Sequence, residues 1–238
     1  FGIDRDPSAI ALASKLLEAF VQRFRAFHTT YDKMDEVAAQ APSGMVDGIL
    51  MDLGVSSLQL DQEDRGFSYS HDAPLDMRMN PQTGISAAQL LASASKEEIT
   101  RILRVYGEEK FASKIAGRIV ATRESEPLTR TSQLAQIVRD CIPAPARRTG
   151  GNPAKRTFQA LRIAVNYELT ILEAALPAAL AHLRVGGRIV IESYQSLEDR
   201  LVKDIFRRGA TDQAPAGVPM IPEELQARLR LLTRGAQL

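Results

Sequence analysis

The chain has 238 residues, 45% hydrophobic and 25% charged, which is enough for one large domain or two modest ones with a real core. Its net charge of +1 means that any nucleic-acid contact must come from locally clustered basic residues. The single cysteine, Cys141, excludes an internal disulfide and a cysteine-based zinc site and fits a reducing cytoplasm. The three histidines are scattered, so no protein-bound metal is expected. No apolar run approaches the roughly 20 residues that cross a bilayer, so no membrane partner is expected, and the oligomeric state stays open.

The first sixty residues alternate short apolar runs with helical stretches. Residues 1–4 are typical of a strand end, as if the chain began inside a strand. Asp6 and Pro7 predict a helix N-cap and first helical position. Further strands are predicted at 24–28 and 46–51, the latter ending at Asp52, with a short helix at 31–40. This alternation predicts a parallel sheet of βαβ units and an α/β fold.

From about residue 60 to 152 no convincing strand is present. Short helices are predicted instead, at 86–92, 96–106, 109–123 and 131–140. A long helix is then predicted from Asn152-Pro153 to Leu183, followed by a Gly186-Gly187 turn and a strand at 188–191. Ser196 to Asp199 resembles a capping box that opens another helix. The sequence therefore predicts an α/β domain at 1–62 and 153–238, with a helical domain inserted at 63–152.

Ligands of open α/β sheets bind beyond the carboxyl ends of the strands, which directs attention to the residues after each predicted strand. Asp4 could hold the hydroxyls of a cofactor ribose or simply precede a helix cap. Tyr31 could stack on an adenine or be an ordinary half-buried aromatic. The segment from Asp52 to Ser57 supplies an acid, a glycine and two hydroxyls, which suit a site and a plain polar turn equally well.

A basic stretch lies between Cys141 and Tyr167, where no acidic residue occurs. Cations at a helix start oppose the helix dipole, so they are poorly explained as stabilisers and favour contact with phosphate. A solvated basic face is the alternative for any one of them. The candidate RNA-binding residues are Arg147, Arg148, Lys155, Arg156 and Arg162.

Six sequence blocks occur in an order that resembles a known family, the bacterial ribosomal RNA small subunit methyltransferase H family, also called MraW. They are DLGVSS with QLD at 52–61 and RGFSY at 65–69, PLDMRM at 74–79, YGEEKFA at 106–112, PAKRTFQALR at 153–162 and SLEDR at 196–200. A lone DLGVSS would be moderate evidence, but this series covers almost the whole chain and is very specific.

The resemblance implies a class I, Rossmann-like methyltransferase fold interrupted by a helical substrate-binding domain. It also implies methyl transfer from S-adenosylmethionine to the exocyclic N4 of a cytidine in the decoding region of small-subunit ribosomal RNA. The small ribosomal subunit, or its RNA, is then the expected partner. Carried over residue by residue, the cofactor contacts fall on Asp4 (ribose), Tyr31 (adenine side), Asp52 and Gln59.

The sequence departs from the family pattern at several places. The family's Gly-Gly-His loop should precede Asp4 by a strand and a helix, so we expect the first strand and this loop to be absent from this chain. Lack of the loop could leave the chain inactive. Many relatives carry Phe-His where this chain has Tyr194-Gln195, so a mechanism with that histidine as base cannot apply. Asn80 stands where an Asp is usual, and the Arg-rich tail is absent.

The amine of cytosine is a poor nucleophile until a group accepts hydrogen bonds from it, so positioning matters more than a strong base. We hypothesise that Asp52, helped by Ser56 or Ser57, orients the amine. The target base must be unstacked or lie in an irregular RNA segment. A second hypothesis is an RNA-binding module without cofactor. A nicotinamide-dependent oxidoreductase is disfavoured because no GxGxxG fingerprint is present.

Overall fold

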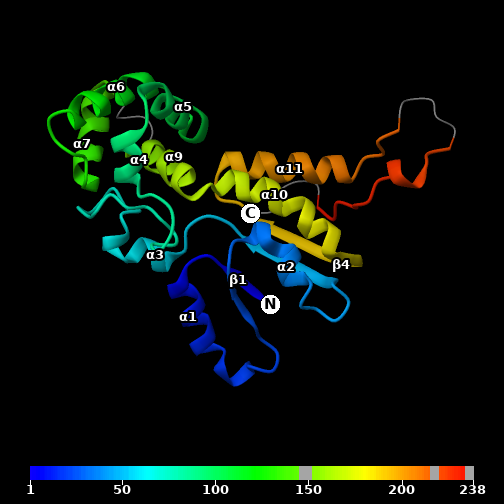
Figure 1. The fold of residues 1–238 in the computed structure, drawn as a ribbon. Helices are drawn as coiled ribbons and strands as arrows, with labels where there is room; N and C mark the ends of the chain where they lie inside the picture. The colour runs from blue at the N-terminus through cyan, green and yellow to red at the C-terminus, as the bar shows by residue number, and fades with distance from the viewer. Residues whose placement is uncertain (145–151, 215–219, 234–238) are drawn as a thin grey trace. The chain divides into compact units, whose positions relative to one another are not determined.

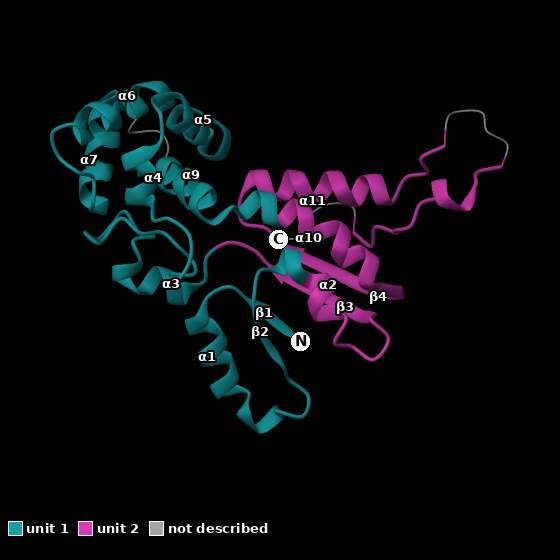
Figure 2. Ribbon diagram, in the orientation of Figure 1, with its two compact units in different colours: residues 1–33, 55–171 teal, residues 34–54, 172–238 magenta. Residues whose placement is uncertain are grey.

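The computed structural model describes residues 1–144, 152–214 and 220–233. The chain divides into two compact units (Figure 2): residues 1–33 with 55–171 form unit 1, and residues 34–54 with 172–238 form unit 2. The predicted helical block thus shares a unit with the N-terminal strands. The boundaries predicted at 62 and 152 are not those of the units, and the three-part domain organisation stays a prediction.

The sheet of unit 1 has two short parallel strands, β1 (Gly2–Asp4) and β2 (Ala26–His28), with Asp4 opposite His28 at their carboxyl ends. Between them lie α1 (Pro7–Leu16) and a 3-10 turn at Glu18–Phe20. The predicted start of α1 is confirmed, because the Asp6 side chain accepts a hydrogen bond from the Ser8 amide at 2.9 Å and Pro7 is the first helical residue. The helix predicted at 31–40 is instead a 3-10 turn at Tyr31–Lys33 followed by α2 (Met34–Ala38).

The rest of unit 1 is helical, and among its described residues only an isolated bridge, Pro74 to Arg130, has β pairing. Figure 1 shows α4 to α7 and α9 gathered around one core, in which Leu91, Leu103, Ile115 and Leu134 have no exposed surface. The elements are α3 (Ser57–Asp61), a 3-10 turn at Glu63–Arg65, α4 (Ala87–Ser93), α5 (Lys96–Gly107), α6 (Ala112–Arg123), α7 (Thr131–Cys141) and α9 (Lys155–Asn166).

The helix ends in unit 1 follow local signals in most cases. The predicted helices at 86–92, 96–106 and 131–140 are present as α4, α5 and α7 within a residue or two. Ser86 and Gln89 form a capping box at the start of α4, and Ser95 caps α5. The start predicted at Glu109 is wrong, because the Glu109 carboxylate accepts from the Phe111 amide in a turn and α6 begins only at Ala112.

The long helix predicted from Asn152 to Leu183 is also wrong, since it is broken into α9 and α10 (Glu168–His182). Tyr167 separates them with a left-handed backbone, φ 54°. Asn152 does accept a hydrogen bond from the Ala154 amide at 2.9 Å, but the helix begins one residue later, at Lys155. The break follows from tertiary contacts at Asn166, described below, and not from a glycine or proline.

Unit 2 contains a second two-stranded parallel sheet, formed by β3 (Val46–Asp52) and β4 (Leu183–Glu192). The pairing runs in register from Gly48 opposite Arg188 to Asp52 opposite Glu192, with an irregularity before Gly48. The predicted strand ending at Asp52 and the predicted parallel pairing are confirmed, although the pairing forms two separate sheets. The other described elements of this unit are α2, the part of α10 from residue 172 onward, α11 (Ser196–Gly209) and a 3-10 turn at Glu223–Leu225.

The capping box predicted at Ser196 is wrong. Ser196 is already the first residue of α11, and Gln195 occupies the N-cap position without a side-chain cap. Glu198 instead accepts from the Tyr194 amide at 3.1 Å and from Gln195 Nε2 at 3.1 Å.

Among the described residues no single helix is both long and apolar enough to span a bilayer, and only α9 and α10 taken together, as a bent pair, reach that length and composition. α9 buries Phe158, Leu161 and Val165 in the helical core, as an ordinary core helix does.

Candidate functional site

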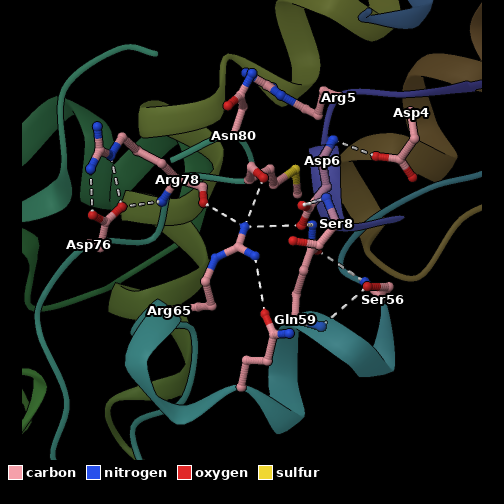
Figure 3. A network of polar contacts seen from close by, with 12 residues as sticks. Asp4, Arg5, Asp6, Ser8, Ser56, Gln59, Arg65, Asp76, Arg78 and Asn80 are labelled. Atoms are coloured by element: carbon pink, nitrogen blue, oxygen red, sulfur yellow. Dashed lines mark hydrogen bonds and ion pairs between the residues drawn. The ribbon is translucent and has the colours of Figure 1, made fainter. Parts of the chain in front are cut away.

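The carboxylate of Asp6 in unit 1 has no exposed surface and accepts three hydrogen bonds (Figure 3). Oδ1 accepts from the Ser8 amide at the start of α1. Oδ2 accepts from Gln59 Nε2 at 2.9 Å and from the Arg65 guanidinium at 3.0 Å. Burial alone would raise the pKa of Asp6, but the bonds from Gln59, Ser8 and Arg65 outweigh it and hold the pKa below its usual value. Asp6 is therefore a buried anion that joins α1, α3 and the turn at Glu63–Arg65.

Arg65 extends this network to the irregular segment that follows it. Its guanidinium donates to the carbonyls of Arg78 at 3.1 Å and Met79 at 2.8 Å. Asn166, at the end of α9, donates to the Met77 carbonyl at 2.7 Å and accepts from the Met79 amide at 2.8 Å. The backbone around residues 77–79 is thus held from two sides, and Met77 adopts φ 62° within it.

Asp4 stands at the carboxyl end of β1, as predicted, and its side chain is exposed. Oδ1 accepts from the Asp6 amide at 2.7 Å, which orients the carboxylate. Partial burial of the carboxyl group raises its pKa, against the opposing effect of the bond from Asp6. The Arg5 amide also lowers the pKa, and the exposed carboxylate can accept further hydrogen bonds from a ligand.

Gln59 and Ser56, both predicted as site residues, have their polar groups engaged inside unit 1. Gln59 is buried, donating to Asp6 and accepting from the Ser56 amide at 3.2 Å, while the Ser56 hydroxyl accepts from the Gln59 amide at 3.3 Å. This reciprocal pair is the capping box of α3. Ser57 is exposed at the first position of α3, and Tyr31 begins the 3-10 turn after β2.

A small polar cavity of about 210 Å³ lies in unit 1 beside the ends of β1 and β2. It is lined by Arg5, His28, Thr29, Thr30, Asn80 and Thr83. In the described part of the chain no cluster of three or more His, Cys, Asp or Glu side chains could hold a metal ion.

In unit 2, the polar group at the strand ends is centred on Asp52. Asp52 and Glu192 are the paired last residues of β3 and β4, and both side chains are exposed. The Tyr194 hydroxyl donates to Asp52 Oδ1 at 3.0 Å and lies 3.3 Å from Glu192 Oε2. The bond to Asp52 and the two neighbouring negative charges raise the pKa of Tyr194 to about 12. Tyr194 is therefore a neutral donor beside two carboxylates.

The sequence reasoning missed Asp6, Arg65 and Tyr194 as parts of these networks. The sequence assigned Asp6 to a helix cap. It placed Tyr194 among the residues that follow a predicted strand, at 193–196, but gave it no role beyond a departure from the family pattern. The available signal for Tyr194 was its position three residues beyond the strand predicted at 188–191, which is part of β4 and pairs with β3.

The structure distinguishes among the predicted basic residues. Arg147 and Arg148 lie outside the described residues. Arg162 is half-buried in a bidentate ion pair with Glu168, at 2.8 Å for both bonds. Lys155 and Arg156 are exposed in the first turn of α9, with one Arg156 nitrogen donating to the Glu108 carbonyl at 3.2 Å. Glu168 is the first acidic residue after the basic stretch, and it neutralises the charge of Arg162.

Comparison with known proteins agrees with the motif series. The sequence model of the MraW methylase family matches residues 1–238. The ribosomal RNA small subunit methyltransferase H of Beutenbergia cavernae is 61% identical over 236 residues, which cover 99% of this chain and 71% of that protein. The proteins of the same name from Streptomyces avermitilis and Nocardioides sp. are 55% and 52% identical, with 99% of this chain and 74% of each relative covered. The chain belongs to the MraW methylase family.

Proposed function

We propose that this protein transfers a methyl group from S-adenosylmethionine to the N4 amine of a cytidine in the decoding region of small-subunit ribosomal RNA. The observation that carries the proposal is the family match along residues 1–238. The name shared by the relatives, ribosomal RNA small subunit methyltransferase H, supports ribosomal RNA as the substrate. A reducing, cytoplasmic location is part of the proposal, since ribosomal subunits are its substrate.

The cofactor role that fits best in unit 1 is that of Asp4. Its Oδ1 is oriented by the Asp6 amide, and the side chain is exposed, so the carboxylate can accept hydrogen bonds from ribose hydroxyls. Tyr31 is proposed for the adenine side. Gln59 fits less well as a direct contact, because its amide is committed to Asp6 and Ser56, so we assign it to shaping the segment that follows Asp52. S-adenosylmethionine supplies the electrophilic methyl group when bound.

Asp52 is the proposed acceptor for the amine. The nitrogen lone pair of cytosine N4 is delocalised into the ring, and a carboxylate that accepts an N–H bond increases its availability. Asp52 Oδ1 is occupied by Tyr194, whereas Oδ2 has no hydrogen-bond partner among the described residues. Ser57, whose hydroxyl likewise has none, is a secondary candidate for this role, and Ser56 is less suited because it caps α3.

The proposal is tested by incubating the protein with labelled S-adenosylmethionine and unmodified small ribosomal subunits, then mapping the product by nuclease digestion and mass spectrometry. We expect N4-methylcytidine at one decoding-region position. Label at a different atom or base would refute the assigned product. Binding of RNA without any methyl transfer would favour the RNA-binding module.

Asp52→Asn should lower turnover about 100-fold, because the amide carries no charge and can turn its NH₂ toward the substrate amine. The matched control is Asp47→Asn, near the other end of β3, where an exposed aspartate pairs with Arg184 at 2.6 Å. Near-normal turnover of the Asp52 variant, or an equal loss in both variants, would show that Asp52 is not the acceptor.

A further inference from the structure

Two carboxylates lie next to one another where β3 and β4 end, and their repulsion has to be offset by a neighbouring group. Asp52 and Glu192 are in register as the last residues of parallel neighbours. Like charges directly opposite on adjacent strands repel each other. A single neutral donor, the Tyr194 hydroxyl, lies at 3.0 Å from one and 3.3 Å from the other.

Tyr194 is placed by hydrogen bonds, not by burial, since 70% of it is exposed. Its amide donates to Oε2 of Glu198, which is 2% exposed at the first turn of α11. Gly54, with φ 90°, brings its backbone beside the ring, so that a Cβ there would lie 3.7 Å from Tyr194 Cδ2. An aromatic side chain that stays largely in water yet is fixed at both ends is better explained by its hydroxyl than by its hydrophobic surface.

We propose that Tyr194 is a positioning residue, whose hydroxyl holds Asp52 Oδ1 so that Oδ2 is presented to the cytosine amine. This inference rests on the proposed function and goes beyond it, because it assigns the orientation of Asp52 to a second side chain. A carboxylate with one oxygen fixed by a donor has lost the freedom to rotate about its terminal torsion. The remaining acceptor direction is then defined before the substrate binds.

The kinetic test compares Tyr194→Phe with Tyr167→Phe. Tyr167 is also exposed, at 61%, but belongs to unit 1, where it lies in the bend between α9 and α10. Loss of one hydrogen bond predicts a fall in kcat of up to about tenfold for Tyr194→Phe, with KM for ribosomal subunits within about twofold of wild type. Tyr167→Phe should match wild type. A raised KM with unchanged kcat would mean that Tyr194 contacts RNA directly, which would overturn the proposal.

A double-mutant cycle with Asp52→Asn shows whether Tyr194 acts through Asp52. Once Asp52 is an amide, the Tyr194→Phe change should cost little further turnover. The same loss in both backgrounds would show that Tyr194 acts independently of Asp52.

A spectroscopic measurement needs no activity. With tyrosine labelled at Cζ, the Tyr194 resonance is assigned by its loss in Tyr194→Phe. At a pH of about 10 a free phenol is half ionised. The Tyr194 resonance should then keep the chemical shift of the neutral phenol in wild type and move towards that of the phenolate in Asp52→Asn. The groups facing this hydroxyl are Asp52 and Glu192. Phenolate formation at this pH in wild type would show that the Tyr194 hydroxyl is not held between the Asp52 and Glu192 carboxylates, which would overturn the proposal. Absence of methyl transfer in wild type with this signature intact would overturn the proposed function instead.

Discussion

Asp6 combines complete burial with a negative charge, and the free energy of that arrangement depends on its three donors. In Asp6→Asn the side chain keeps its shape but loses the charge that faces Arg65. Breaking a buried charge pair is costly, and Arg65 keeps its two carbonyl partners, so we expect unit 1 to lose about 2–3 kcal/mol of unfolding free energy. Urea denaturation followed by circular dichroism measures this.

The control for Asp6 is Asp72→Asn, which removes an ion pair with Arg130 in which both side chains are nearly half exposed. Such pairs contribute little, so its loss should be clearly smaller. Equal losses in the two variants would contradict the structural role of Asp6.

The contribution of Asp6 to stability also depends on pH. Because the folded-state pKa of Asp6 is depressed, its contribution is full above the unfolded value of about 3.9 and is lost as the pH falls through the folded value. The difference between wild type and Asp6→Asn should therefore shrink in acid.

The sequence predicts single residues well where the signal is local. Asp6 followed by Pro7 identified a helix start because capping is a matter of adjacent atoms. The partners of Asp6 on Gln59 and Arg65 could not be found this way, since they lie 53 and 59 positions away and no spacing rule connects them. The hydroxyl of Tyr194 reaches Asp52 across 142 positions for the same reason.

At the scale of elements, α5 and α9 approach closely at Gly107, the last residue of α5. A Cβ on Gly107 would lie 2.6 Å from the Arg156 carbonyl oxygen, which is backbone and cannot swing away. Gly107→Ala should therefore destabilise unit 1 by about 1–3 kcal/mol by overpacking this contact.

Gly117→Ala, in the middle of α6, is the matched control in thermal denaturation. Its Cβ would meet only the flexible end of Lys96 at 3.5 Å, and alanine favours the helix by about 1 kcal/mol. The two substitutions should shift the melting temperature in opposite directions. A higher melting temperature for both variants would show that helix propensity, not packing, decides at Gly107, and a lower one for Gly117→Ala would contradict the expected gain from alanine.

The existence of α4, α5 and α7 was predictable because Gly, Pro and Ser/Thr residues separate the short helical segments along the chain. The break between α9 and α10 was not, because Tyr167 is neither glycine nor proline, and a left-handed tyrosine carries no local signature. Its cause lies in Asn166, whose side chain bonds Met77 and Met79, 89 and 87 positions away. The capping box predicted at the start of α11 was wrong for a related reason. Glu198 accepts a hydrogen bond from the Tyr194 amide and does not pair with a serine N-cap.

For the whole molecule, a net charge of +1 limits non-specific attraction to RNA, so the salt dependence of binding should reflect a few local cations. Lys155→Gln and Arg156→Gln should each lower the slope of log K against log salt by about 0.7 to 0.9. Arg162→Gln should leave the slope unchanged and lower thermal stability, because its guanidinium is paired with Glu168. Filter binding to small-subunit RNA over a salt series measures these slopes. An equal change for Arg162→Gln would show that its ion pair opens for RNA.

Asn166 has a further consequence for how the whole sequence tolerates change. Its one amide group serves as acceptor for Met79 and as donor to Met77 and to Arg162. Aspartate lacks the donors, leucine lacks both functions, and glutamine is longer by one methylene. In a saturation-mutagenesis map of fitness, position 166 would therefore be as intolerant as a reacting group, although its contribution is entirely architectural.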